Sequence, residues 1–168
     1  MSMIRTPRLL TSLLLGLAAA HASASGFGPA AAVSGQFQPE QDLLVANFDS
    51  KPDPDDLQAI AALGTMLQHE RFSEVDFLAV AGAYGIQGGS YIAAPKLFKL
   101  AFGDQWVDAH GDREAAVKAA SQRAIKTLKD GGDVWLQEAG QSDFSAMLVK
   151  AIRAELPALN SKQRIHTV

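Results

Sequence analysis

The 168-residue chain contains no cysteine, which excludes disulfides, thiolate nucleophiles and thiolate zinc sites together. Aromatic residues make up only 7% of the sequence and the formal net charge is -3, so the chain has no basic surplus to neutralise a phosphate backbone. We therefore expect no nucleic-acid partner. The groups that remain for chemistry are carboxylates, histidines and backbone oxygens.

The N-terminal residues have the pattern of a secretory signal peptide. Arg5 and Arg8 precede the apolar run 9–20, and small residues directly after this run offer cleavage sites. The run is about half as long as the roughly 20 residues that a membrane-spanning helix needs, which disfavours a membrane anchor. We predict a signal peptide over residues 1–24, a secreted or periplasmic product, and no membrane association after cleavage.

The rest of the chain is predicted to form one α/β domain behind a short lead-in. Residues 25–41 are rich in glycine, alanine, proline and serine, which is typical of a flexible segment. Apolar runs then predict strands, and apolar residues at helical spacing predict helices between them. The predicted strands are 43–48, 75–81, 133–139 and 164–168, and the predicted helices are 57–67, 91–102, 117–128 and 143–156. This alternation indicates a doubly wound, Rossmann-like parallel sheet covered on both faces.

Four carboxylates follow the first predicted strand within eight residues: Asp49, Asp53, Asp55 and Asp56. In parallel sheets, ligands bind beyond the carboxyl ends of the strands. Like charges this close repel unless a cation or shared protons compensate, and a hard divalent ion, Ca²⁺ before Mg²⁺, satisfies that need. The alternative is a helix cap at Asp55 or Asp56 within a solvated acidic loop. That alternative does not account for Asp49 at the end of a buried strand.

The acidic segment resembles the nucleoside hydrolase superfamily, whose first strand ends in D-x-D-x-G-x-D-D before a helix. Aligned on the closing pair, Asp49 matches the first acid, Asp55 the catalytic acid and Asp56 a calcium ligand. Lys51 stands where the family has its second metal-binding aspartate, and Asp53 stands where the family has glycine. The spacing D-x3-D-P-D-D is closer to a secreted, nucleoside-hydrolase-like branch of the superfamily.

The resemblance implies hydrolysis of the N-glycosidic bond of a riboside or a related sugar. Asp55 would take a proton from water, while Asp49 and Asp56 would bind Ca²⁺ with Asp53 substituting for the missing acid. The Lys51 ammonium offers an alternative, because it can neutralise Asp49 and Asp56 without any metal. A non-catalytic relative that binds a sugar or calcium therefore stays open, as does an interaction domain with a merely capping loop.

Two further residues and the end of the chain complete these expectations. Gln137 and Glu138, at the end of the third predicted strand, are candidate substrate-binding residues, with an ordinary surface loop as the alternative. The last predicted strand reaches Val168 with no following helix to cover it, and the resembled family is longer. We therefore expect residues 42–168 to be the N-terminal part of an apparently truncated nucleoside-hydrolase-like domain, inactive on its own. The oligomeric state stays open.

Overall fold

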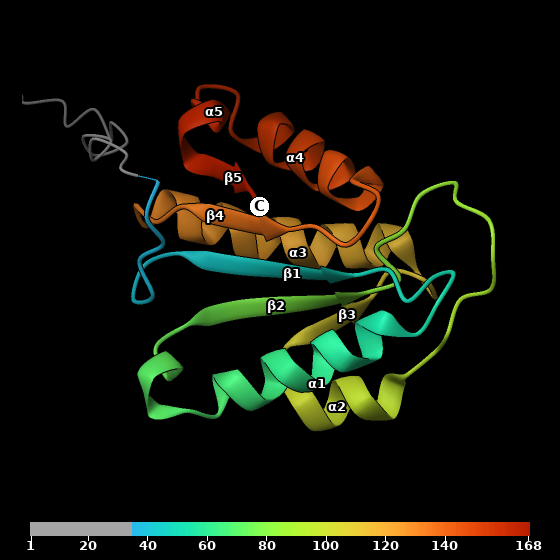
Figure 1. Cartoon of the computed structure of the whole chain (residues 1–168). Helices are drawn as coiled ribbons and strands as arrows, with labels where there is room; N and C mark the ends of the chain where they lie inside the picture. The colour runs from blue at the N-terminus through green and yellow to red at the C-terminus, as the bar shows by residue number, and fades with distance from the viewer. Residues whose placement is uncertain (1–34) are drawn as a thin grey trace, which may run out of the picture.

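The first strand of the domain lies at the centre of its sheet. The computed structural model describes residues 35–168, so the predicted signal peptide and residues 25–34 of the lead-in lie outside the described part. Five parallel strands are arranged in the order β3-β2-β1-β4-β5 (Figure 1). The strands are β1 Leu43–Phe48, β2 Asp76–Ala81, β3 Trp106–Asp108, β4 Val134–Gln137 and β5 Ile165–Thr167. The predicted α/β, doubly wound class is confirmed.

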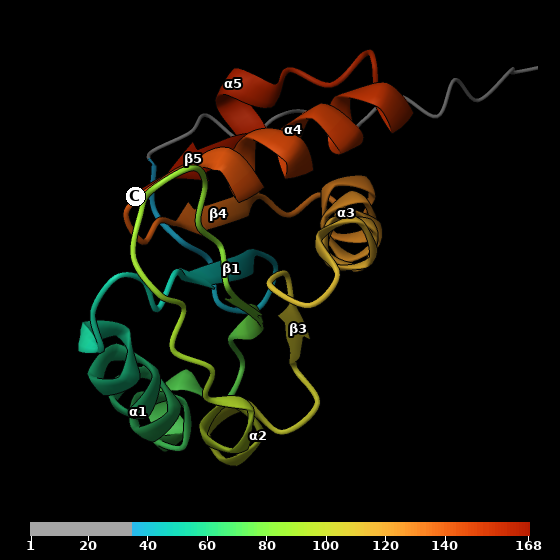
Figure 2. The same ribbon diagram turned by 90° about the vertical axis from the view of Figure 1, so that its right-hand side faces the viewer.

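Helices cover both faces of this sheet. They are α1 Asp55–Leu67, α2 Pro95–Phe102, α3 Arg113–Lys129, α4 Asp143–Glu155 and the single-turn α5 Ser161–Arg164, with a short 3-10 turn at Glu70–Phe72. Figure 2 shows α1 and α2 on one side of the sheet and α3 and α4 on the other. No helix in the described part of the chain has the length and apolar character to cross a membrane.

The side chains of β1 alternate between two hydrophobic cores, as a strand with covered faces requires. Ala46 and Phe48 pack with Ile60 of α1 and with Phe98 and Phe102 of α2. The second core joins alternate residues of β1 and β4 to α3 and α4; its β1 and β4 members are Leu43, Val45, Val134 and Leu136. Because both faces of β1 are buried, polar groups of the first loop begin where the strand ends.

The connections define a switch point between β1 and β4. The helices α1 and α2 link β1 to β2 and β2 to β3 on one face, and α3 then carries the chain to β4 on the other side of β1. The chain therefore leaves β1 toward one face of the sheet and leaves β4 toward the opposite face. Such a point opens a crevice at the carboxyl ends of the strands, where ligands of open α/β sheets bind.

Several element boundaries differ from the prediction. The three-residue strand β3 was not predicted, because so short a segment shows no periodicity. The helix α2 begins at Pro95 rather than near residue 91, since proline is suited to the first helical turn. The helix α3 begins at Arg113, because the Asp112 side chain caps it by accepting a hydrogen bond from the Ala115 N–H at 2.9 Å.

The described end of the lead-in packs against the sheet instead of remaining free of it. The Phe37 ring meets the Trp135 ring edge-on at 6.0 Å. Asp42 is buried and accepts three hydrogen bonds: from the Gln38 N–H at 2.8 Å, the Asp133 N–H at 2.8 Å and the Trp135 indole N–H at 2.9 Å. This carboxylate thus joins the amino ends of β1 and β4.

We expect Asp42→Asn to lower the free energy of unfolding by about 2 kcal/mol, because hydrogen bonds to a charged acceptor are among the stronger ones in proteins. Urea denaturation followed by tryptophan fluorescence measures this loss. The exposed Asp104, which pairs with Lys99, is the matched control, and Asp104→Asn should change stability by less than about 0.5 kcal/mol. Equal effects of the two substitutions would contradict the role given to Asp42.

Candidate functional site

The acidic loop between β1 and α1 turns back on itself at Ser50. This residue is buried and has a φ of 47°, in the left-handed region that few non-glycine residues adopt. Its N–H donates to Asp56 Oδ2 at 2.7 Å, and its carbonyl accepts from the Ile92 N–H at 2.9 Å. The turn brings Asp49, at the end of β1, next to Asp56, in the first turn of α1.

The carboxyl groups of Asp49 and Asp56 form a partly buried pair. Asp49 accepts hydrogen bonds from the Lys51 N–H and from Gln87 Nε2, each at 3.1 Å and each to a different oxygen. Burial raises the pKa of Asp56 to about 6, and the charge of the adjacent Asp49 raises it too, while the hydrogen bond from the Ser50 N–H opposes them. Asp56 therefore exchanges its proton near pH 6.

The other two aspartates form a second, exposed pair. Hydrogen bonding with Asp55 and the charge of that residue raise the pKa of Asp53. The Asp56 N–H donates to Asp55 Oδ1 at 2.9 Å. Pro54 occupies the N-cap position of α1, and no side chain caps this helix. Neither Asp55 nor Asp56 is the N-cap residue, but both lie in the first turn of α1, where a negative charge favours the helix, as the alternative also expected. The four carboxylates are divided into two pairs instead of converging on one point.

This division bears on the predicted Ca²⁺. Within residues 35–168, no group of three or more histidine, aspartate or glutamate side chains is placed to hold a metal ion. Both oxygens of Asp49 and Oδ2 of Asp56 already accept hydrogen bonds from N–H groups. Calcium prefers six to eight oxygen ligands. The described residues therefore do not form a calcium site by themselves.

Lys51 forms no ion pair with Asp49 or Asp56. Its ammonium lies 4.2 Å from the centroid of the Tyr84 ring, and among the described ion pairs none involves this lysine. The Tyr84 hydroxyl in turn is 2.7 Å from His110 Nδ1. Direct neutralisation of Asp49 and Asp56 by this ammonium, one of the two expectations from the sequence, is therefore not the arrangement found, because a cation–π contact holds the lysine elsewhere.

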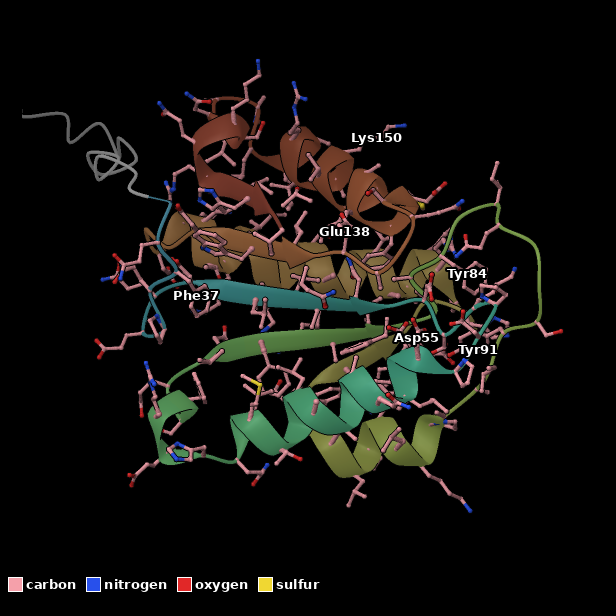
Figure 3. All side chains as sticks on the ribbon, viewed as in Figure 1. Phe37, Asp55, Tyr84, Tyr91, Glu138 and Lys150 are labelled. Carbon is pink, nitrogen blue, oxygen red and sulfur yellow. The ribbon has the colours of Figure 1, made fainter. Side chains whose placement is uncertain are left out.

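The loop between β2 and α2 lies over the acidic loop. Figure 3 shows Tyr84 and Tyr91 of this segment at the same end of the sheet as Asp55. The backbone at Gly89 has a φ of 89° and approaches Pro52 so closely that a Cβ would lie 2.3 Å from the proline Cβ. His110 stacks on Tyr91 at 4.0 Å, and burial raises the pKa of Tyr91 to about 12, so its phenol stays neutral. An aromatic cluster thus borders the acid pair.

Gln137 and Glu138 lie on opposite faces of the sheet, as neighbours in a strand must. Gln137 lines a crevice of about 200 Å³ together with Asp56 and apolar residues of β1 and α1. Glu138 instead contacts Asn47, whose Nδ2 is 3.4 Å from Glu138 Oε2, on the side of α4. The structure brings Gln137, but not Glu138, to Asp56. The two candidate substrate-binding residues therefore line different crevices.

Asn47 and a contact among three residues with ring side chains at this edge of the sheet were missed in the sequence analysis. Asn47 is a fully buried amide within the apolar run of β1, and a polar residue in a buried strand was the available signal. Tyr84, Tyr91 and His110 come together only through the fold, and no sequence spacing predicts that contact.

Comparisons of the chain with protein-family profiles, with curated proteins and with solved structures find no match.

Protonation of Asp56 should make stability depend on pH. The pKa of about 6 in the folded protein lies above the usual value of 3.8, so folding favours the protonated form and stability falls as the pH rises from about 4 to 6. We expect the free energy of unfolding of Asp56→Asn, relative to that of wild type, to rise by about 1 kcal/mol from pH 4 to pH 7, after allowance for solvent screening. Urea denaturation at both pH values measures this gain. With Asp104→Asn as control, parallel curves for wild type and Asp56→Asn would contradict the raised pKa.

Lys51→Asp should create a calcium response that wild type lacks. The substitution removes a cation from the acidic loop and adds a carboxylate two residues after Asp49. We expect millimolar Ca²⁺ to raise the melting temperature of Lys51→Asp but not that of Lys51→Met, which removes the charge without adding a ligand. Equal shifts in wild type and both variants, measured by thermal denaturation, would show that Lys51 does not oppose the metal.

Proposed function

We propose that this protein is a hydrolase that cleaves the N-glycosidic bond of ribosides or related sugars. The observation that carries the proposal is the partly buried Asp49–Asp56 pair, in which the pKa of Asp56 is raised to about 6 at the switch point between β1 and β4. Perturbed carboxylates at a ligand-binding edge are typical of active sites. The resemblance of the acidic segment to nucleoside hydrolases supplies the reaction class.

Each member of the pair has a role in this proposal. At neutral pH, Asp56 is mostly ionised and accepts a proton from the water that attacks the anomeric carbon; a base with a pKa near the working pH is efficient. Asp49 is oriented by Gln87 and by the Lys51 N–H, so its negative charge stabilises the positive charge that develops on the sugar ring. Gln137 lines the crevice beside Asp56 and offers its amide to a sugar hydroxyl.

The geometry favours Asp56 over Asp55 as the base. The resemblance assigns this role to Asp55, but Asp55 is exposed and bonded to its own loop, whereas Asp56 faces the crevice. A base shielded from bulk water retains a stronger influence on a bound water molecule. Secretion or a periplasmic location belongs to the same proposal and depends on the predicted signal peptide.

Binding of ribose is the first test. We expect millimolar ribose to shift the NMR signals of Asp56 and Gln137 in the full chain. Asp49→Asn and Asp56→Asn should each weaken binding at least about 5-fold, because a charged acceptor for a sugar hydroxyl is lost. Asp104→Asn should leave binding unchanged. Absence of any saturable shift would contradict a sugar site and favour an interaction domain.

Release of free base from inosine or uridine then separates a hydrolase from a binding protein. Where base is released, Asp56→Asn should lower kcat at least about 10²-fold, the lower range for a general base, and Asp55→Asn should lower it far less. Circular dichroism of each variant at the assay pH shows whether unfolding explains the loss. A larger loss in Asp55→Asn than in Asp56→Asn would assign the base to Asp55. Ribose binding without turnover is the result expected of a non-catalytic relative and also of a truncated domain that is inactive on its own.

A further inference from the structure

A second pocket lies on the opposite face of the sheet from the crevice at Asp56. It has a volume of about 530 Å³ and is bounded by the carboxyl end of β4, by β5 and by one side of α4. Pockets that bind small molecules typically measure about 300–1,000 Å³. Figure 3 shows Glu138 between β4 and α4, and Lys150 on α4 itself. The proposed hydrolase reaction uses none of these residues.

Next to Glu138, this pocket borders side-chain oxygens that accept no hydrogen bond. Asn47 Nδ2 lies 3.0 Å from Ser145 Oγ and 3.4 Å from Glu138 Oε2, so the amide orients both side chains. Glu138 Oε1 and Asn47 Oδ1 are buried and have no hydrogen-bond partner. A buried acceptor without a donor is costly, most of all when it is charged. A ligand that brings a cationic donor to Glu138 would remove that cost.

The outer end of the pocket has the opposite charge. Lys150 and Arg153 line it, and neither occurs in the ion pairs of the described residues. Leu136 and Val149 form an apolar wall in the same pocket. A complementary ligand therefore carries an ammonium at one end, an apolar body and an acid at the other end.

We propose that this pocket binds a short peptide with free termini. Its amino-terminal ammonium pairs with the Glu138 carboxylate, an apolar side chain packs on Leu136 and Val149, and its carboxylate meets Lys150 and Arg153. Ser145 and Arg153 are eight residues apart on α4, or about 12 Å at the rise of an α-helix. An extended chain spans about 3.3 Å per residue, so a peptide of three to four residues has the required length.

Titration of the full chain with the tripeptide Ala-Leu-Ala tests the proposal. NMR should show saturable shifts at Ser145 and Val149, while N-acetylation or C-amidation of the peptide should each weaken binding about 10-fold, which corresponds to about 1.4 kcal/mol. The single amino acid leucine, which is too short to reach both ends, should bind more weakly still. Equal affinity for the free and the N-acetylated peptide would overturn the assignment of Glu138.

Substitutions in the protein test the same contacts. Glu138→Gln keeps the shape of the side chain and the acceptor for Asn47, and it should lower the affinity for the peptide about 10-fold. The double substitution Lys150→Met and Arg153→Met should lower the affinity by a similar factor. The matched controls, Glu40→Gln and Lys129→Met, replace exposed residues outside the pocket and should change nothing. Ribose binding at Asp56 should persist in Glu138→Gln, so failure of the sugar site and failure of the peptide site are distinguishable.

Self-association is the competing outcome. In this outcome, sedimentation shows that wild type is a dimer and that Val149→Glu is a monomer. With no peptide binding, this result would assign the pocket to a contact between two copies of the chain and overturn the peptide proposal.

Discussion

Burial of β1 on both faces is the constraint on which the rest of the structure depends. The strand has a neighbour on each side and a hydrophobic core over each face, so no charged side chain is accommodated between Leu43 and Phe48. The acidic residues therefore begin at Asp49, where the strand leaves the core. Because β1 and β4 send the chain toward opposite faces, the first carboxylate that follows β1 lies at the mouth of the switch point.

Much of the fold follows from periodicity in the sequence, because buried strands and amphipathic helices carry their own signals. The apolar run of β1 and the helical spacing in α4 match the structure closely. The strand β3 carries no such signal, since it has three residues and is placed by its pairing with β2. Tertiary contacts with a neighbouring strand, rather than local propensity, make that segment a strand.

The location of the acidic site was predictable, whereas its internal arrangement was not. The position of Asp49 after a buried strand indicated the edge of the sheet. The direction of Lys51 depends on Tyr84, which lies in a loop 33 positions further along the chain, and no spacing rule links the two. The separation of Gln137 from Glu138 was within reach, because strand residues alternate with a period of two and adjacent residues face opposite ways.

The backbone of Ser50 joins two parts of the molecule that are far apart in sequence. Its N–H binds the Asp56 carboxyl group and its carbonyl binds the Ile92 N–H in the loop before α2. Thermodynamic linkage makes such a coupling reciprocal. A ligand that moves the Ile92 N–H away from the Ser50 carbonyl, and with it the Ser50 N–H, would change the proton affinity of Asp56, and loss of the Asp56 proton would change the free energy of that movement by the same amount.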